Sequence, residues 1–279
     1  RPVFRDKVAT SGLRRGPSGP NASLRVGFVP KRPWAGPPPG AYVSMLRVEN
    51  PIIAALTARV RRAGSEPLVT WYRPAEGDRT ELSVKSFANW VDKTANLLET
   101  LGVDGLVAGP LSAAHPGHWM SLIWPLAAWQ RGLTYRGETA ADAELVVTGP
   151  ERPEPTPGVL TIACSLHPLG LGLRGLPDGV LDFTTEALAE PDAHWAAPVA
   201  ASAPAWSEGG HTLSHAQLAE LPSQAARVLV RPTTAWETLV AALLSPLLGG
   251  GSAVVVEGEV DGDTLERIAL TERVSSPLA

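Results

Sequence analysis

Cysteine is nearly absent from this chain of 279 residues, which contains a single thiol, that of Cys164. One cysteine cannot form an internal disulfide bond. It stands in the apolar run 159–164, which is typical of a buried strand. The lack of disulfides fits a reducing compartment, so we predict a cytoplasmic protein.

Long hydrophobic runs are also lacking. No run approaches the ~18 apolar residues that a membrane-spanning helix needs. The most apolar stretch, residues 239–248, is too short and contains Pro246. We therefore expect no membrane partner. With 44% hydrophobic residues the chain can still bury a sizeable core, which excludes global disorder.

Several catalytic and metal-binding motifs are missing too. The chain has no G-x-S-x-G nucleophile elbow and no H-E-x-x-H helix, and it has no lysine after Lys93. The pairs His115/His118 and His211/His215 have no cysteine partners. We interpret them as solvated or capping histidines at helix starts, and we predict neither a metal site nor a catalytic residue.

Basic residues gather in the first 44 residues, which hold eight Arg or Lys, one Asp and eight prolines. We predict that this segment is disordered. It could be a basic arm for nucleic acid, a transit peptide, or a segment upstream of the true start at Met45. The rest of the chain carries sixteen basic and twenty-seven acidic residues, so we expect no nucleic-acid surface on it. We predict one α/β domain over residues 45–279, with a proline-rich connector at 149–158.

Helical and strand patterns alternate along this body. Asn50 and Pro51 form a helix start, and Gly64 ends that helix. Further helices are predicted at residues 83–102, 116–129, 214–226, 236–248 and 263–271, the last capped by Asp263. Strands are predicted at 68–73, 79–82, 105–109, 133–135, 144–148, 159–164, 180–183, 227–230 and 252–257. This order predicts an α/β fold with a mixed to parallel sheet flanked by helices.

The stretch 205–257 is the most informative. A polar turn at residues 207–210 precedes Ser214 and Gln217, which have the spacing of a capping box and predict a helix to about residue 226. A polar turn that opens a helix is where a parallel α/β fold would place a phosphate loop. The other glycine pattern, G-x-G-x-x-G at 170–175, is followed by a turn signature. We interpret it as a flexible loop without a dinucleotide.

Four stretches carry a resemblance to a known family: residues 68–102, 118–132, 213–218 and 246–256. In pattern and order they resemble the N-terminal domain of the adenylate-forming superfamily, which includes acyl-CoA synthetases, adenylation domains and luciferases. The likeness covers about residues 50–275. It extends to a group of short actinobacterial proteins similar to AMP-binding enzymes.

This resemblance places a cofactor-binding phosphate loop at Ser207, Glu208, Gly209, Gly210 and His211. The family's loop is rich in Ser, Thr and Gly and carries a lysine, whereas here lysine is missing and Glu208 adds a negative charge. The chain also stops where the family continues, so we expect a truncated domain. The resemblance therefore implies a degenerate loop without adenylation and without a required cofactor, although binding of ATP or AMP stays open.

These observations support three hypotheses about function. The first is a pseudoenzyme that binds an acyl or nucleotide-like ligand, or a partner protein. The second is an active ligase component completed by another chain. The third is an interaction module that dimerises through an exposed sheet edge.

Overall fold

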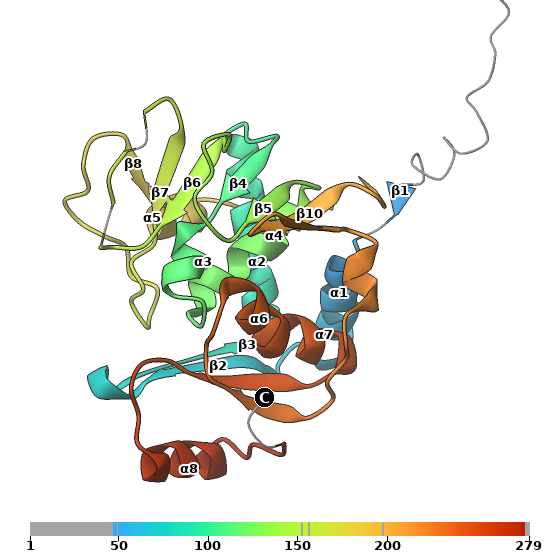
Figure 1. The fold of residues 1–279 in the computed structure, drawn as a ribbon, viewed down its shortest axis with the longest axis vertical. Helices are drawn as coiled ribbons and strands as arrows, with labels where there is room; N and C mark the ends of the chain where they lie inside the picture. The colour runs from blue at the N-terminus through green and yellow to red at the C-terminus, as the bar shows by residue number, and fades with distance from the viewer. Residues whose placement is uncertain (1–46, 49, 152, 156, 197, 277–279) are drawn as a thin grey trace, which may run out of the picture. The chain divides into compact units, whose positions relative to one another are not determined.

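The computed structural model describes residues 47–276, except residues 49, 152, 156 and 197 (Figure 1). The expected disorder of residues 1–44 lies outside this described range. The helices are α1 (Pro51–Ala63), α2 (Val84–Thr100), α3 (Pro110–Ala114), α4 (Trp119–Gln130), α5 (Phe183–Leu188), α6 (Ala235–Leu239), α7 (Ser245–Gly249) and α8 (Gly262–Thr271). Shorter helical turns are η2 (Pro74–Glu76), η3 (Gln217–Glu220) and the π-helical η4 (Val240–Leu244). The strands are β1 (Arg47–Val48), β2 (Pro67–Arg73), β3 (Asp78–Ser83), β4 (Leu106–Ala108), β5 (Thr134–Arg136), β6 (Leu145–Thr148), β7 (Leu160–Ala163), β8 (Val180–Asp182), β9 (Val199–Ala200), β10 (Pro204–Glu208), β11 (His211–Ser214), β12 (Arg227–Val230) and β13 (Ser252–Val256).

Two parallel-rich sheets organise these elements. The first has seven strands in the order β11-β10-β5-β4-β6-β7-β8, and its pairings are parallel except that of β10 with β11. The second has the order β12-β13-β2-β3, in which β3 returns antiparallel to β2. The strands β1 and β9 form a separate antiparallel pair. The predicted mixed to parallel α/β fold is confirmed, with two main sheets.

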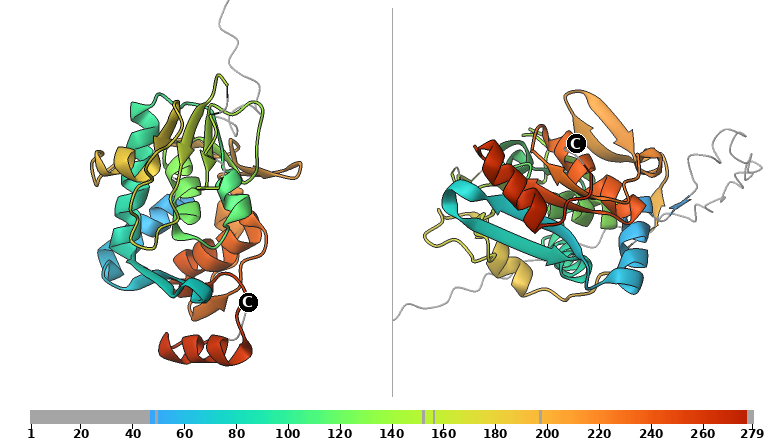
Figure 2. Two further views of the ribbon diagram at one scale, coloured as in Figure 1. Left: turned by 90° about the vertical axis from the view of Figure 1, so that its left-hand side faces the viewer. Right: turned by 90° about the horizontal axis from the view of Figure 1, so that it is seen from below.

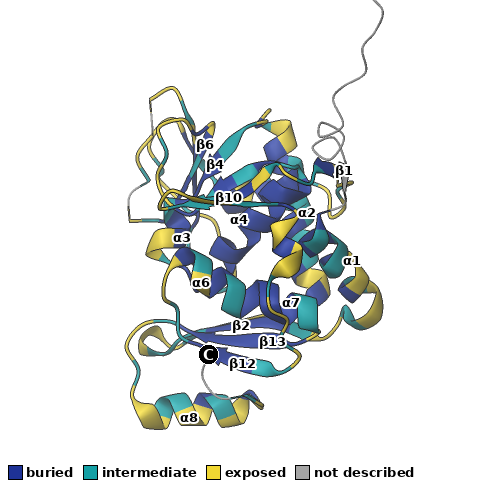
Figure 3. Ribbon diagram, turned by 45° about the vertical axis from the view of Figure 1, so that its right-hand side comes forward, coloured by how far each residue is buried: buried dark blue, intermediate teal, exposed yellow. Residues whose placement is uncertain are grey.

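Helices α2, α4, α6 and α7 lie between the two sheets, and α8 covers the far face of the four-stranded sheet (Figures 1 and 2). All 12 residues of α4 are buried, as the dark blue centre of Figure 3 shows. A helix that is apolar all round is expected to be enclosed on every side.

The four-stranded sheet is buried on both faces, which explains the apolar run 253–256 in its central strand β13. Val230 and Val255 pack into the main core between the sheets. Their neighbours along the strands, Leu229 in β12 and Val254 and Val256 in β13, pack with Ile268 of α8 in a second cluster. Successive side chains of a strand point to opposite faces, so both sets must be apolar.

The glycine run 249–251 connects α7 to β13 and meets two separate constraints. Gly250 has φ +85°, a left-handed conformation that favours glycine. A side chain at Gly249 would collide with the backbone of Gln224, and one at Gly251 with the carbonyl oxygens of Gln224 and Ala226. The turn therefore requires glycine for conformation at its centre and for space on either side.

The helix predicted at residues 236–248 is present but contains the π-helical turn η4. The Ser245 N–H donates to the Val240 carbonyl, five residues back. Pro246 comes directly after, and a proline inside a helix has no N–H and crowds the carbonyl four residues before it. One wide turn relieves that crowding.

Two helix boundaries differ from the sequence-based expectation. The cap of α8 is Asp261, whose Oδ1 accepts from the Thr264 N–H at 2.7 Å, so the prediction of Asp263 as the cap was wrong. The helix predicted to open at Pro116 begins at Trp119. The short helices α3 and α5 were not predicted, although Pro110 and the cap Asp182 mark their starts.

The glycine run gives the first testable prediction. We expect Gly249→Ala to lower the free energy of unfolding by about 1–3 kcal/mol, because the added methyl group meets backbone that cannot move aside cheaply. Urea unfolding followed by tryptophan fluorescence measures this. Gly262→Ala, where nothing lies within 4 Å of the added Cβ, is the matched control and should change stability by at most ~0.5 kcal/mol. Equal effects of the two substitutions would refute the packing argument.

Candidate functional site

The residues expected to form a phosphate loop instead form the tip of a β-hairpin. Strand β10 pairs antiparallel with β11, with Glu208 opposite His211, and β10 also pairs parallel with β5. The prediction that this polar turn opens a helix was wrong. The chain turns back as a strand, because two consecutive glycines favour a tight hairpin turn.

Gly209 and Gly210 form the turn, with φ values of +55° and +82°. Positive φ at both central residues is the geometry of the two-residue turns that match strand twist. Such a turn leaves few backbone N–H groups to surround an anion. One of them is already used, since the Gly209 N–H donates to Glu138 Oε1 at 3.2 Å.

The capping box at Ser214 forms, but the long helix does not. The Ser214 N–H donates to Gln217 Oε1 at 2.9 Å, and the Gln217 N–H donates back to Ser214 Oγ at 3.4 Å. Only the single turn η3 forms after it, and this turn ends at Leu221, whose ψ of 146° is extended. Pro222 comes next, and a residue before proline is displaced from the helical region. The prediction of a helix from Ser214 to about residue 226 was therefore wrong.

Three carboxylates surround the hairpin tip: those of Glu138, Glu208 and Glu237. Partial burial, followed by the negative charge of Glu138, raises the pKa of Glu208. The charge of Glu237 raises it further, while hydrogen bonds with Trp206 and the backbone of Trp236 act in the opposite direction. Hydrogen bonds from Thr233 and Thr234 lower the pKa of Glu237, which keeps that side chain ionised. The tip is therefore a region of negative potential.

Aromatic side chains pack against the base of the hairpin. The rings of Tyr135 and Trp206 lie 5.5 Å apart between centroids, and those of Trp206 and Trp236 lie 5.1 Å apart. A Cβ added at Gly137 would lie 2.9 Å from Cζ2 of Trp206, so this glycine allows the strand end to approach the indole. The Nε1–H of Trp129 donates to the Ala205 carbonyl at 2.7 Å and ties β10 to α4.

Four histidines were expected to be solvated or to cap helices. Two of them, His118 and His215, are instead buried, although His118 also caps a helix. His118 caps α4, with Nδ1 accepting from the Met120 N–H at 3.2 Å, but it is buried. Burial, and then the charge of His115, lower its pKa to about 3. His215 is buried too, and its Nδ1 lies 2.6 Å from the amide nitrogen of the cap residue Asn50. Burial lowers the pKa of His215 to about 4, so both histidines are neutral.

The remaining predicted site residues lie at or beside the turn, with Ser207 half-buried and His211 exposed. The structure thus places residues 207–211 in one turn. It adds three neighbours that were not predicted as site residues: Glu138, Trp236 and Glu237. Glu138 follows β5 and Glu237 lies in α6, so their positions beside the tip depend on strand order. Trp236 had been assigned only to a helix.

Cys164 is buried after β7, as predicted, and burial raises its pKa to about 12. Among the residues that the structure describes, no three His, Cys, Asp or Glu side chains are grouped to hold a metal ion. None of the described helices is long and apolar enough to cross a membrane.

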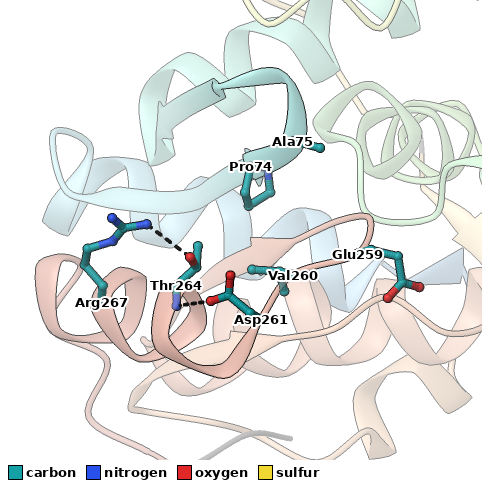
Figure 4. A pocket seen from close by; sticks show the side chains of 7 residues that line it. All are labelled: Pro74, Ala75, Glu259, Val260, Asp261, Thr264 and Arg267. Atoms are coloured by element: carbon teal, nitrogen blue, oxygen red, sulfur yellow. Dashed lines mark hydrogen bonds between the residues drawn. The ribbon is translucent and has the colours of Figure 1, made fainter.

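A separate cavity of about 540 Å³ lies between the end of β2 and the start of α8 (Figure 4). Three of its polar residues, Asp261, Thr264 and Arg267, are joined by hydrogen bonds. Asp261 accepts from the Thr264 N–H, and Arg267 Nη2 donates to Thr264 Oγ1 at 3.2 Å. These hydrogen bonds belong to the N-terminal cap and first turn of α8, so this wall of the cavity has a structural role.

Comparisons with known proteins bear on both the family and the fold. No family model matches the chain. A TIGR03089 family protein of Mycobacterium tuberculosis (strain ATCC 25618 / H37Rv) is 31% identical over 249 residues, which cover 81% of this chain and 96% of that protein. The crystal structure of an acyl-CoA synthetase from Brucella canis matches with a TM-score of 0.62 and 18% identity, over 85% of this chain and 49% of that one. Apo MatB from Rhodopseudomonas palustris matches with a TM-score of 0.58 and 19% identity, over 82% and 49%. The chain therefore has the fold of an acyl-CoA synthetase over about half the length of those structures.

The raised pKa of Glu208 predicts a specific pH dependence. A carboxyl group whose pKa is raised on folding stabilises the fold below its ordinary value of 4.5, and this stabilisation is lost as pH rises through the folded value. We therefore expect Glu208→Gln to be more stable than the parent at pH 7, with the difference shrinking to zero below about pH 4. Urea midpoints measured from pH 4 to pH 8 test this. The exposed Glu220→Gln is the control, and a Glu208→Gln gain that does not depend on pH would contradict the electrostatic account.

Proposed function

The chain belongs to the TIGR03089 family, and we propose that it is a non-adenylating relative of the acyl-CoA synthetases. In this proposal it is a pseudoenzyme that binds a ligand or a partner protein without activating a carboxylate. The single observation that carries the proposal is the bond from the Gly209 N–H to the carboxylate of Glu138. A backbone donor at the position of the phosphate loop is occupied by an anion of the protein itself.

The charge around this bond supports the same conclusion. Transfer of a phosphoryl or adenylyl group needs positioned cations or metal to stabilise the negative charge that develops. At this tip Glu208 adds a negative charge where the resemblance would place phosphate oxygens, and Glu138 and Glu237 lie beside it. A polyphosphate bound here would be repelled by three carboxylates and would have to displace one of them from its donor.

The ligand that remains compatible with the hairpin is neutral and apolar in part. Trp206 and Trp236 offer aromatic surface next to the tip, and Trp236 is only half-buried. An acyl group that carries no phosphate could pack against these two indole rings, whereas the charged phosphates of a nucleoside triphosphate could not. A partner protein that inserts an apolar side chain is the corresponding alternative.

Calorimetry with ATP, with AMP and with magnesium tests the proposal on the full chain. We expect no heat of binding at concentrations that would detect a Kd of about 1 mM, and no carboxylate-dependent exchange of pyrophosphate into ATP. Micromolar binding, which corresponds to about −8 kcal/mol, or any pyrophosphate exchange would overturn the proposal and favour an active ligase component.

A charge-reversal variant tests whether the carboxylates are the cause. We expect Glu138→Ala combined with Glu208→Lys to bind inorganic pyrophosphate more tightly than the parent, because the Gly209 N–H loses its acceptor and a cation is introduced. The control combines Glu266→Ala with Glu220→Lys, two exposed positions with the same change of net charge. Equal pyrophosphate binding by the two double variants would show that the gain is non-specific.

A further inference from the structure

A second candidate site lies at the carboxyl edge of the seven-stranded sheet. Strands β4 and β6 are neighbours there, but the chain leaves them in opposite directions. After β4 it continues to β5 on one side, and after β6 to β7 on the other. In open parallel sheets, ligands bind outside the carboxyl ends of the strands at the point where the strand order reverses.

A cavity of about 440 Å³ occupies this position. The loop after β4 contributes one wall and the loop after β6 the other. Its lining residues are Pro110, Ala114, His115, Thr148, Gly149 and Glu151. The volume lies within the range of small-molecule sites, roughly 300–1,000 Å³.

Glu151 is folded back over the end of β6 and faces His115. Its Oε1 lies 3.0 Å from His115 Nε2. A Cβ added at Gly149 would lie 2.5 Å from its Oε2 and 3.5 Å from Cδ2 of His115. Glycine at position 149 therefore leaves the space in which this carboxylate is held across the strand ends.

A second carboxylate approaches the same imidazole from the four-stranded sheet. Glu257 follows β13, and its Oε1 lies 4.0 Å from His115 Nδ1, while its Oε2 accepts from Trp71 Nε1 at 2.8 Å. Burial raises the pKa of Glu257. The nearby cation Arg73 is held by Asp78 at 2.6 Å. Carboxylate oxygens therefore approach the imidazole of His115 at both of its ring nitrogens.

The geometry does not suit a metal ion, because the two carboxylates lie at opposite nitrogens of the His115 ring. A metal ligand set must converge on one point, and the described residues contain no such set. The arrangement suits a ligand that donates hydrogen bonds from a positive group while its carbon chain contacts Pro110 and Ala114.

We propose that this cavity binds a small organic cation, a primary amine or a guanidine, through Glu151 and the imidazole of His115. The cavity and its charges come from loops that do not include the hairpin tip. This inference therefore does not rest on the proposed loss of adenylation.

Titration of the full chain with agmatine and with 1,4-diaminobutane tests the inference, with the ring resonances of His115 as the readout. Those resonances are assigned with His115→Asn. We expect saturable shifts with at least one of the two amines and none with succinate, which has the same number of carbons as the diamine and the opposite charge.

The substitution Glu151→Gln should weaken amine binding by about tenfold or more, given the typical worth of a hydrogen bond to a charged group. Glu154→Gln, an exposed position on the same loop, should leave it unchanged. Glu257→Gln should weaken it by a smaller factor, since that carboxylate acts through His115. The absence of a saturable shift with both amines, equal affinity in Glu151→Gln, or binding of succinate as tight as that of the amines would overturn the proposal.

Discussion

The burial of α4 on all sides fixes the relation between the two sheets and thereby both candidate sites. Its side chains fill the core between the sheets. At its C-terminal end Trp129 holds β10 through the Ala205 carbonyl. At its N-terminal end the indole of Trp71 meets the ring of His118, with centroids 4.6 Å apart. One enclosed helix therefore sets the position of the hairpin and brings the carboxyl edges of the two sheets together.

The hairpin tip illustrates how a fold can persist while the chemistry of one loop changes. A phosphate loop works because several N–H groups of the backbone stay free for an anion. Here two glycines in left-handed conformations make the turn short, and Glu138 takes the Gly209 N–H. The aromatic support beneath it, from Tyr135 to Trp236, remains packed. Fold likeness to acyl-CoA synthetases is therefore compatible with a different activity.

Much of the fold could be predicted from the sequence, because periodic burial dictates it. Strands such as β12 and β13 have apolar side chains on both faces, and helix caps such as Asn50 have a short-range signature. The capping box at Ser214 was also real, but the same hydrogen bonds form at a single turn, and Pro222 prevents that turn from growing into a helix. Local patterns do not distinguish a cap of one turn from a cap of a long helix.

The site was less predictable, because its charges come from distant segments. Glu138 and Glu208 are seventy residues apart in the chain, and parallel pairing of β5 with β10 brings them together. The same holds for Glu151 and Glu257, which lie just beyond strands of different sheets. Strand order is set by the packing of whole elements, so the sequence alone does not show which of these carboxylates lie close together.

The most direct measurement monitors the amide resonance of Gly209 while pyrophosphate is added to the parent protein. This N–H is already bound to Glu138, so the resonance should stay in place at millimolar pyrophosphate. It should move when Glu138 is replaced by Ala, which removes the acceptor of the Gly209 N–H. A saturable shift of the Gly209 amide in the parent would mean that the hairpin still receives phosphate, and would contradict the central claim.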